Sequence, residues 1–235
     1  IRVSLRAMLP MLERLLEPRR DAIARLHDRA AAERVARRAA QRERVSTEMG
    51  RAVTTPFVAC AEVLRAIGPE VAIVDEAASL MPHTRALLDS PSWRQYSSCR
   101  GGGLGWGMPA AVGASLGLDR NPVVSLIGDG AAMYSPQALW TAANENLPVT
   151  FVVMNNRGYR ILKNFMAAQS HYLSVQANRY IAMDLDDPAI DFPALAASMG
   201  VPARRVERAS DIAAAVEAGI ASGRPNLIEI PISAG

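Results

Sequence analysis

Ser125-Leu-Ile-Gly-Asp-Gly130 closes an apolar run that begins at Pro122, and Met154-Asn-Asn156, 24 residues after Gly130, closes a second run that begins at Val149. Each run has the length and composition of a buried strand. Residues 135–146 between them have helical spacing, and we expect a core-facing stripe made of Leu139, Trp140, Ala143 and Leu147. Strand, helix and strand in this order predict a right-handed βαβ unit with parallel strands.

Asp129 and Asn156 stand at the ends of these two strands. Since parallel strands end at one edge of a sheet, where open α/β sheets bind ligands, we expect the two side chains to lie close together. One carboxylate and one amide oxygen suit a hard cation that takes its other ligands from water and a phosphate. The flanking glycines, Gly128 and Gly130, would let a phosphate approach the backbone. Capping of a turn by the same residue types is the alternative.

The composition is that of a globular protein. The chain has 235 residues, half of them apolar, which suffices for one large domain or for one domain with part of another. No apolar run approaches the roughly 20 residues of a membrane span, and the first apolar residues are interrupted by charges, unlike a signal peptide. Cys60 and Cys99 form neither a disulfide framework nor a metal-ligand cluster. We therefore expect a cytoplasmic protein that does not enter a membrane.

Basic residues are concentrated near the start. Residues 1–44 contain 12 Arg against 6 Asp or Glu, so that they carry +6 and the remainder −3. An Arg-rich helix can bind nucleic acid, but here acidic residues are interleaved and aromatic residues are missing. A solvated helix or linker is the favoured interpretation, and we expect no nucleic acid partner. Because the chain opens within a helical pattern at Ile1, we also expect a fragment of a longer polypeptide.

The rest of the chain alternates strands and helices. Thr55-Pro56 is typical of a helix start, and Gly68-Pro69 of a helix end. We expect further strands at 71–74, 203–206 and 226–230, helices at 109–116, 159–168, 191–199 and 210–221, a loop or helix start at 75–79, and an irregular flap at 169–188. This order predicts an α/β fold with a mainly parallel sheet and helices on both faces.

The Gly-Asp-Gly and Asn-Asn elements at this spacing resemble the cofactor motif of thiamine diphosphate-dependent enzymes. The glycine-rich stretch Cys99-Arg-Gly-Gly-Gly-Leu-Gly-Trp-Gly107 is similar to a segment of the same enzymes. Ala138-Leu-Trp-Thr-Ala-Ala143 and Phe151-Val-Val-Met-Asn-Asn156 look most like benzoylformate decarboxylases, with acetolactate synthases next. The resemblance implies a thiamine diphosphate-binding fold. It makes residues 51–235 the C-terminal diphosphate-binding domain and residues 1–50 the tail of a middle domain with an Arg-rich linker, without the N-terminal pyrimidine-binding domain.

The resemblance also implies which residues hold the cofactors, thiamine diphosphate and Mg²⁺. Asp129 and Asn156 would ligate Mg²⁺ through their side chains, and Gly158 through its carbonyl. Ser79 would bind the diphosphate through its hydroxyl. The remaining contacts implied near the phosphates are Gly128, Gly130, Ala131 and Tyr159.

Catalytic roles implied by the family fall in the glycine-rich stretch. Gly102 would accept a hydrogen bond from the cofactor's 4′-amino group, Leu104 would hold its two rings bent together, and Gly103 would line the same site. The bend brings the amino nitrogen beside the reactive carbon, so the protein contributes positioning. Without the resemblance, Gly102 and Leu104 would be packing residues before a helix. Glu76 has two open interpretations: a surface acid at a strand end, or a cofactor-site residue.

Ile161, Leu162 and Phe165 fall where decarboxylase relatives line the substrate pocket, although their spacing is equally typical of plain core. The implied reaction is decarboxylation of a small-molecule 2-oxo acid. Ile161 is bulkier than the small residue expected beside an aryl group, which favours a smaller or aliphatic substrate. The histidines are isolated in the sequence and are interpreted as surface residues: His27, His83 and His171.

In the family, an activating glutamate lies in the N-terminal domain and reaches the cofactor of a neighbouring subunit. The resemblance therefore implies a homo-oligomer, a dimer or tetramer, whose glutamate comes from another domain or subunit, and an inactive fragment. Two alternatives stay open: an acetolactate synthase-type carboligase, often with a flavin in this family, and a non-catalytic cofactor-binding module. A Rossmann dehydrogenase is disfavoured because Gly101 to Gly107 follows no convincing strand.

Overall fold

The computed structural model describes residues 5–88 and 95–234, and the chain divides into two compact units, Ile1–Ser46 and Thr47–Gly235. The first unit contains α1 (Leu5–Leu16), the short 3₁₀ helix η1 (Glu17–Arg19) and most of α2 (Arg20–Glu48). No residue of α2 is buried. The Arg-rich segment is thus helical with no core face, while its assignment to a middle-domain tail and linker stays a prediction.

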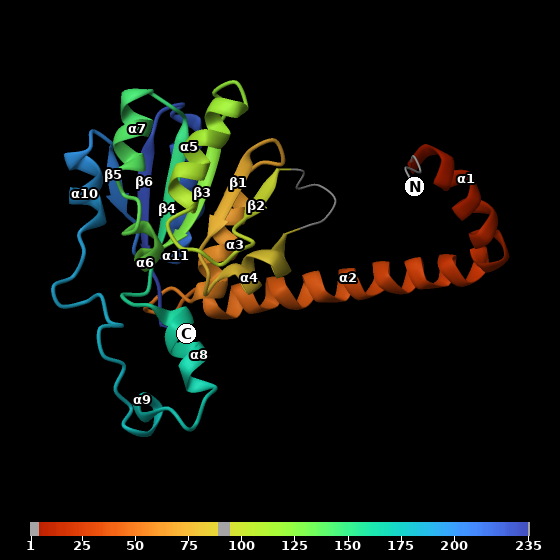
Figure 1. Cartoon of the computed structure of the whole chain (residues 1–235), viewed down its shortest axis with the longest axis horizontal. Helices are drawn as coiled ribbons and strands as arrows, with labels where there is room; N and C mark the ends of the chain where they lie inside the picture. The colour runs from red at the N-terminus through yellow and green to blue at the C-terminus, as the bar shows by residue number, and fades with distance from the viewer. Residues whose placement is uncertain (1–4, 89–94, 235) are drawn as a thin grey trace. The chain divides into compact units, whose positions relative to one another are not determined.

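The second unit is built on a six-stranded parallel sheet with strand order β2-β1-β3-β4-β6-β5 (Figure 1). The strands are β1 (Ala72–Glu76), β2 (Tyr96–Ser98), β3 (Val123–Gly128), β4 (Val149–Asn155), β5 (Ala203–Arg205) and β6 (Asn226–Pro231). The helices are α3 (Pro56–Ala66), α4 (Met81–Leu87), α5 (Gly107–Gly117), α6 (Asp129–Ala132), α7 (Ala138–Asn144), α8 (Arg160–Ala167), α9 (Leu173–Gln176), α10 (Phe192–Ser198) and α11 (Ala209–Ala221). The expected α/β class and mainly parallel sheet are confirmed.

Alternate residues of the central strands point to opposite faces of the sheet, and each face has its own core. One core joins the sheet to α3 and α11, with Val58 and Ile212 among its residues. The other joins it to α5, α7 and α10, with Met108 and Phe192 among its residues. Helices therefore cover both faces, as expected from the alternation of elements (Figure 1). No helix in the described residues is long and apolar enough to cross a membrane.

The βαβ unit predicted from Pro122 to Met154 is present. β3 pairs in parallel with β4 over six positions, from Val123 opposite Val149 to Gly128 opposite Met154. This register places the residues that follow the two strands at the same edge of the sheet. Between the strands, Leu139 and Leu147 are buried as expected, but Trp140 is 58% exposed, so its place on the core stripe is wrong. Successive residues of a helix point in different directions. Because Leu139 faces the sheet, the next residue, Trp140, points away from it.

Two sequence expectations around β1 are wrong. Asp75 and Glu76 are not in a loop or helix start: they are the last two residues of β1, and both are buried. A short strand, β2, does precede the glycine-rich segment and pairs with β1 from Tyr96 to Ser98. Its three residues are too few to give a periodic pattern, because alternation needs at least four.

Candidate cofactor site at the carboxyl ends of the strands

Asp129 directly follows β3, and the residue is 2% exposed. Its Oδ1 accepts a hydrogen bond from the Gly130 amide at 2.8 Å, and its Oδ2 accepts one from the Gly158 amide at 3.0 Å. Burial raises the pKa of this carboxyl, and the backbone amides oppose the rise because they stabilise the carboxylate. A bound cation would act in the same direction as the amides.

The two asparagines after β4 differ in their surroundings. Asn155 is buried; its Nδ2 donates to Oε1 of Glu229 at 2.7 Å, and its Oδ1 accepts from the Arg157 amide at 2.9 Å. The Oδ1 atom of Asn156 is also buried, yet it has no hydrogen-bond partner in the described part of the chain. Leaving a buried acceptor unpaired is costly, and a cation would satisfy it. Asn156 therefore fits a metal-ligand role, whereas Asn155 fits a structural one.

Gly158 joins the ends of β3 and β4, since its amide donates to Asp129. Its carbonyl accepts from the Arg160 amide at 2.8 Å, which leaves one lone pair for a cation. A Cβ on Gly158 would lie 2.7 Å from the Met183 carbonyl oxygen, and a Cβ on Gly130 would lie 2.6 Å from the Tyr159 ring. Both glycines are thus required for close approach, and the Tyr159 ring covers Gly130.

Carboxylate, amide and carbonyl oxygens are the donors that Mg²⁺ prefers. In residues 5–88 and 95–234, no group of three His, Cys, Asp or Glu side chains gathers as an alternative metal site. The oxygen donors of Asp129, Asn156 and Gly158 meet that preference, and the unpaired Oδ1 of Asn156 is the observation that supports the fit.

Glu76 fixes the glycine-rich segment against the end of β1. The residue is 2% exposed, so its interpretation as a surface acid is wrong. Its Oε1 accepts from the Trp106 amide at 3.1 Å, and its Oε2 accepts from the Gly107 amide at 2.6 Å. Because Gly107 is the first residue of α5, this carboxylate pairs amides that have no partner within the helix.

The segment before α5 is more open. Gly102 and Gly103 are exposed, whereas Leu104 is half-buried and packs against the core on the α5 side of the sheet. Gly102 has a φ of 70°, a conformation that glycine adopts without strain. The Cys99 thiol donates to the Gly103 carbonyl at 3.4 Å. The cofactor contacts expected of Gly102, Gly103 and Leu104 stay predictions.

Ser79 and Asn156 line one cavity of about 230 Å³. The residues that complete its wall are Pro56, Leu80, His83, Arg160, Asn164, Ser233 and Ala234. Arg160 brings a positive charge that suits an anion such as a diphosphate. His83, interpreted from sequence as a surface residue, lies in this wall and packs its ring edge-on against Phe57 at 5.8 Å.

Sequence reasoning missed His83, Arg160 and Asn164 as cavity residues. His83 lies on α4, and Arg160 and Asn164 lie on α8. These two helices line one cavity only in the folded chain. One signal was available: Arg160 directly follows Tyr159 at the start of the helix after the Asn-Asn pair.

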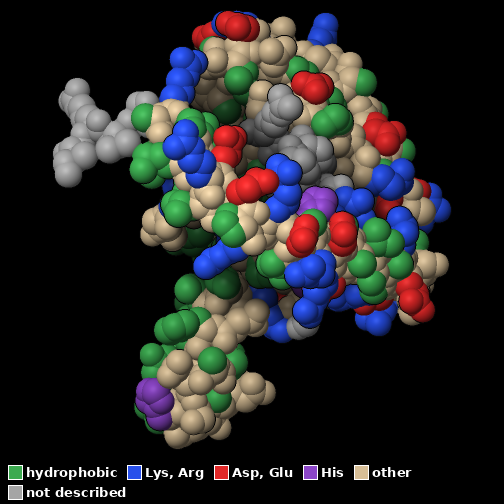
Figure 2. All heavy atoms as spheres, turned by 90° about the vertical axis from the view of Figure 1, so that its right-hand side faces the viewer, with side chains coloured by type: hydrophobic (Ala, Val, Ile, Leu, Met, Phe, Trp, Pro, Cys, Tyr) green, Lys and Arg blue, Asp and Glu red, His purple; other side chains and the backbone are tan. Residues whose placement is uncertain are grey.

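The predicted substrate-pocket residues are on α8 but not in this cavity. Ile161, Leu162 and Phe165 are 41%, 43% and 62% exposed, so the alternative of plain core is wrong. Hydrophobic side chains are seen over the α8–α9 lobe at the bottom of Figure 2. An exposed apolar helix face of this kind is typical of a surface that contacts a substrate or another protein region.

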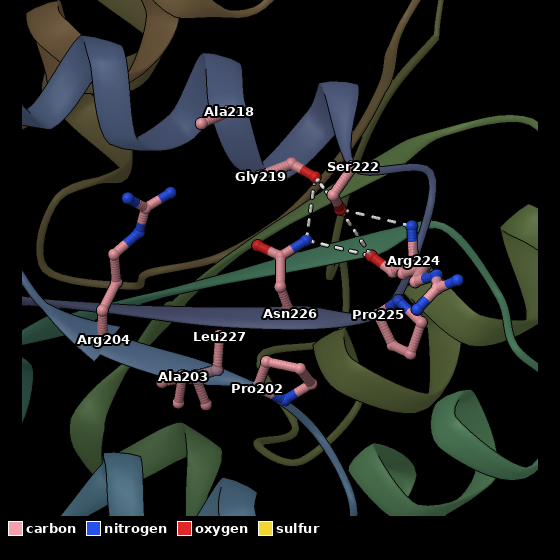
Figure 3. Close-up of a pocket in the computed structure, with 10 residues that line it drawn as sticks. All are labelled: Pro202, Ala203, Arg204, Ala218, Gly219, Ser222, Arg224, Pro225, Asn226 and Leu227. Carbon is pink, nitrogen blue, oxygen red and sulfur yellow. Dashed lines mark hydrogen bonds between the residues drawn. The ribbon is translucent and has the colours of Figure 1, made fainter.

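A second cavity, of about 320 Å³, lies at the amino ends of β5 and β6 (Figure 3). Asn226 donates through Nδ2 to Thr150 Oγ1 at 3.1 Å and to the carbonyls of Gly219 and Arg224 at 2.9 and 3.0 Å. These bonds hold the end of α11 against β6. The cavity contains none of the predicted site residues, so the candidate site remains the one at the carboxyl ends.

Comparison with known proteins identifies the family of the chain. Residues 90–230 match the family model of the thiamine pyrophosphate enzyme, C-terminal TPP binding domain. The chain belongs to this family of thiamine diphosphate-dependent enzymes.

Two curated relatives are the "Putative acetolactate synthase large subunit IlvX" of Mycobacterium tuberculosis and the benzoylformate decarboxylase of Pseudomonas aeruginosa. The first is 37% identical over 179 residues, which are 74% of this chain and 34% of the relative. The second is 36% identical over 171 residues, which are 72% of this chain and 31% of the relative. The chain therefore spans about a third of the length of these relatives.

Solved structures give the same fold. The thiamine diphosphate-dependent 4-hydroxybenzoylformate decarboxylase of Rhodococcus jostii RHA1 has a TM-score of 0.70 and 32% identity, covering 78% of this chain and 33% of that one. The benzoylformate decarboxylase of Polynucleobacter necessarius has a TM-score of 0.68 and 29% identity, covering 77% of this chain and 33% of that one. The expected thiamine diphosphate-binding fold is confirmed.

Proposed function

We propose that this chain is the diphosphate- and Mg²⁺-binding part of an enzyme that decarboxylates a 2-oxo acid to an aldehyde. The observation that carries the proposal is the buried Oδ1 of Asn156, which has no hydrogen-bond partner among the described residues. Asn156 lies in the same loop as Gly158, whose amide donates to Asp129. This arrangement leaves an oxygen donor where the family motif calls for a cation. The decarboxylases among the relatives support the reaction type.

In this proposal Asp129, Asn156 and the Gly158 carbonyl hold Mg²⁺, and Ser79 and Arg160 bind the diphosphate in their shared cavity. Bound thiamine diphosphate supplies the electron sink that decarboxylation requires. The residues of this chain supply position and charge: Glu76 fixes the glycine-rich segment through the amides of Trp106 and Gly107.

For the substrate we propose a 2-oxo acid that is smaller than benzoylformate or aliphatic. Ile161, Leu162 and Phe165 form the exposed apolar face of α8. The branched Ile161 side chain leaves less room beside a substrate than a small residue would. In any preparation that turns over, an aliphatic 2-oxo acid should have the higher kcat/KM, and a preference for benzoylformate would contradict this assignment.

An acetolactate synthase-type carboligase is the second candidate, and it is favoured by the 37% identity to the acetolactate synthase relative. Product analysis separates the two: a decarboxylase releases an aldehyde, and a carboligase releases an acetohydroxy acid. A third candidate is a non-catalytic module that binds the cofactor. Such a module would bind thiamine diphosphate and Mg²⁺, but the complete assembly would form no product from a 2-oxo acid.

We also propose that the chain alone does not turn over, since in the family the activating glutamate comes from another domain or subunit. A glutamate from another subunit requires an oligomer, and we propose a homodimer or homotetramer. We also propose that this enzyme is located in the cytoplasm. Incubating only this polypeptide with thiamine diphosphate, Mg²⁺ and a 2-oxo acid tests the point. We expect cofactor binding without CO₂ release, and measurable CO₂ would contradict it.

A further inference from the structure

We propose that Glu229 is a positioning residue for the cation site: it acts through Asn155 to hold the loop of residues 155–158 in the form that presents Asn156. The inference rests on the proposed function, because it concerns the same Mg²⁺ site.

Glu229 lies within the sheet, far along the sequence from this loop. It is a residue of β6, opposite Val153 on β4 and Arg205 on β5, and it is 1% exposed. Its Oε2 accepts from Nε of Arg205 at 2.9 Å. A buried carboxylate needs such a partner, because an unpaired buried charge is strongly unfavourable. Arg205 thereby fixes the orientation of the Glu229 carboxylate.

The other oxygen of Glu229 reaches the loop. Oε1 accepts from Nδ2 of Asn155 at 2.7 Å, a short bond to a charged acceptor. Asn155 is two residues beyond Val153, so it shares a sheet face with Glu229. Once Nδ2 is held by Glu229, Oδ1 points to the backbone and accepts from the Arg157 amide at 2.9 Å.

The bond to the Arg157 amide sets the turn that carries the site. Arg157 has a φ of 59°, which a residue with a side chain adopts only when its surroundings hold it there. The next amide, that of Gly158, donates to Asp129. A series of hydrogen bonds therefore runs from Arg205 through Glu229 and Asn155 to the backbone of the loop, which contains the predicted metal ligands Asn156 and Gly158. Residues that orient metal ligands in this way strongly affect metal affinity.

The test uses Glu229→Ala, Asn155→Ala and the double variant of the 235-residue chain. Two quantities are measured: the apparent Mg²⁺ dissociation constant at fixed thiamine diphosphate by calorimetry, and amide hydrogen exchange of residues 155–158 without ligands. We expect each single variant to weaken Mg²⁺ binding by about tenfold or more and to speed exchange in the loop. Adding Glu229→Ala to Asn155→Ala should weaken binding no further, because both act on one path.

Glu62→Gln is the matched control. Glu62 is also a buried glutamate, but it lies on α3, and its carboxylate pairs with Arg65 at 2.7 Å. It should lower thermal stability without changing Mg²⁺ affinity or loop exchange. If Glu229→Ala does not fold, Glu229→Met replaces it, because methionine has a similar length and no oxygen that could accept from Nδ2 of Asn155.

Unchanged Mg²⁺ affinity and unchanged loop exchange in Glu229→Ala would overturn the inference. A full additional loss in the double variant would overturn the path through Asn155. A wild-type chain that binds neither Mg²⁺ nor thiamine diphosphate would instead contradict the proposed function. The exchange experiment without ligands would still decide whether Glu229 orders the loop.

Discussion

Asp129 and Gly158 are 29 residues apart in the sequence, and the Gly158 amide donates to Oδ2 of Asp129 at 3.0 Å. This bond joins the loop after β4 to the residue that follows β3. It exists because the two strands pair in parallel, with Gly128 opposite Met154. The sheet register thus brings the Asp129 carboxylate and the loop after β4 together in one site.

The contact between α5 and β1 gives a prediction about stability. In Gly107→Ala, the new Cβ would lie 2.7 Å from Cβ of Glu76 and 2.8 Å from its Oε2. We expect this overpacking to lower the free energy of unfolding by about 1–3 kcal/mol.

Gly113→Ala on the same helix is the matched control, since no atom lies within 4 Å of its new Cβ. It should raise the free energy of unfolding by up to about 1 kcal/mol, because alanine favours helix. Urea unfolding of both variants measures the difference. Equal effects of the two substitutions would show that Glu76 does not restrict this helix end.

The two cysteines should differ in reactivity. Burial raises the pKa of the Cys60 thiol to about 12, whereas Cys99 is half-buried beside the Gly103 carbonyl. At about pH 8, near the ordinary pKa of a thiol, iodoacetamide should modify Cys99 and leave Cys60 intact in the folded chain. Peptide mass spectrometry measures both sites.

The same reagent probes the glycine-rich segment. If Gly102 and Gly103 contact the cofactor, thiamine diphosphate with Mg²⁺ should slow the modification of Cys99. Thiamine diphosphate with a chelator is the control and should give no protection. An unchanged Cys99 rate with bound cofactor would refute the predicted contact of this segment.

The buried carboxylate of Asp75 near the end of β1 gives a pH dependence. Burial raises the pKa of Asp75, although the Tyr96 hydroxyl donates to it at 2.7 Å and the Ala77 amide at 2.9 Å. The folded state therefore binds the Asp75 proton more tightly than the unfolded state does. Stability should fall as pH rises from about 3.9, the unfolded pKa, through the raised folded pKa.

Asp75→Asn should make that fall smaller, and chemical unfolding at a series of pH values measures it. Asp129 also has a raised pKa, so part of the fall should remain. Asp211→Asn serves as a control because the Arg208 hydrogen bond lowers the pKa of Asp211, which places its effect below this pH interval. If stability fell as steeply with pH in Asp75→Asn as in the wild type, the fall could not be assigned to Asp75.

The elements that sequence predicts well are the long and strongly patterned ones. The apolar runs that form β3 and β4 need no information from elsewhere, because a buried parallel strand is apolar on both faces. Thr55 with Pro56 likewise marks the start of α3, where the Thr55 hydroxyl accepts from the Val58 amide at 3.4 Å. Motif spacing then identifies Asp129 and Asn156 as residues at neighbouring strand ends.

Features that depend on distant packing were not predictable. Glu76 has two open interpretations in the sequence, and neither includes the contact of its carboxylate with two backbone amides at the start of α5. Trp140 has the spacing of a core residue, yet α7 turns it outward. His83 and Arg160 have no shared pattern, and only the fold puts them in the wall of one cavity.

The central claim is that Asp129 and Asn156 hold Mg²⁺ for thiamine diphosphate, and calorimetric titration of thiamine diphosphate tests it most directly. The wild-type chain should bind with Mg²⁺ and lose binding with a chelator. Asp129→Ala should bind at least about tenfold more weakly while its circular dichroism spectrum remains native, and Asp211→Ala, on the exposed surface, should bind like the wild type. Equal, Mg²⁺-independent affinity of the wild type and Asp129→Ala would contradict the account.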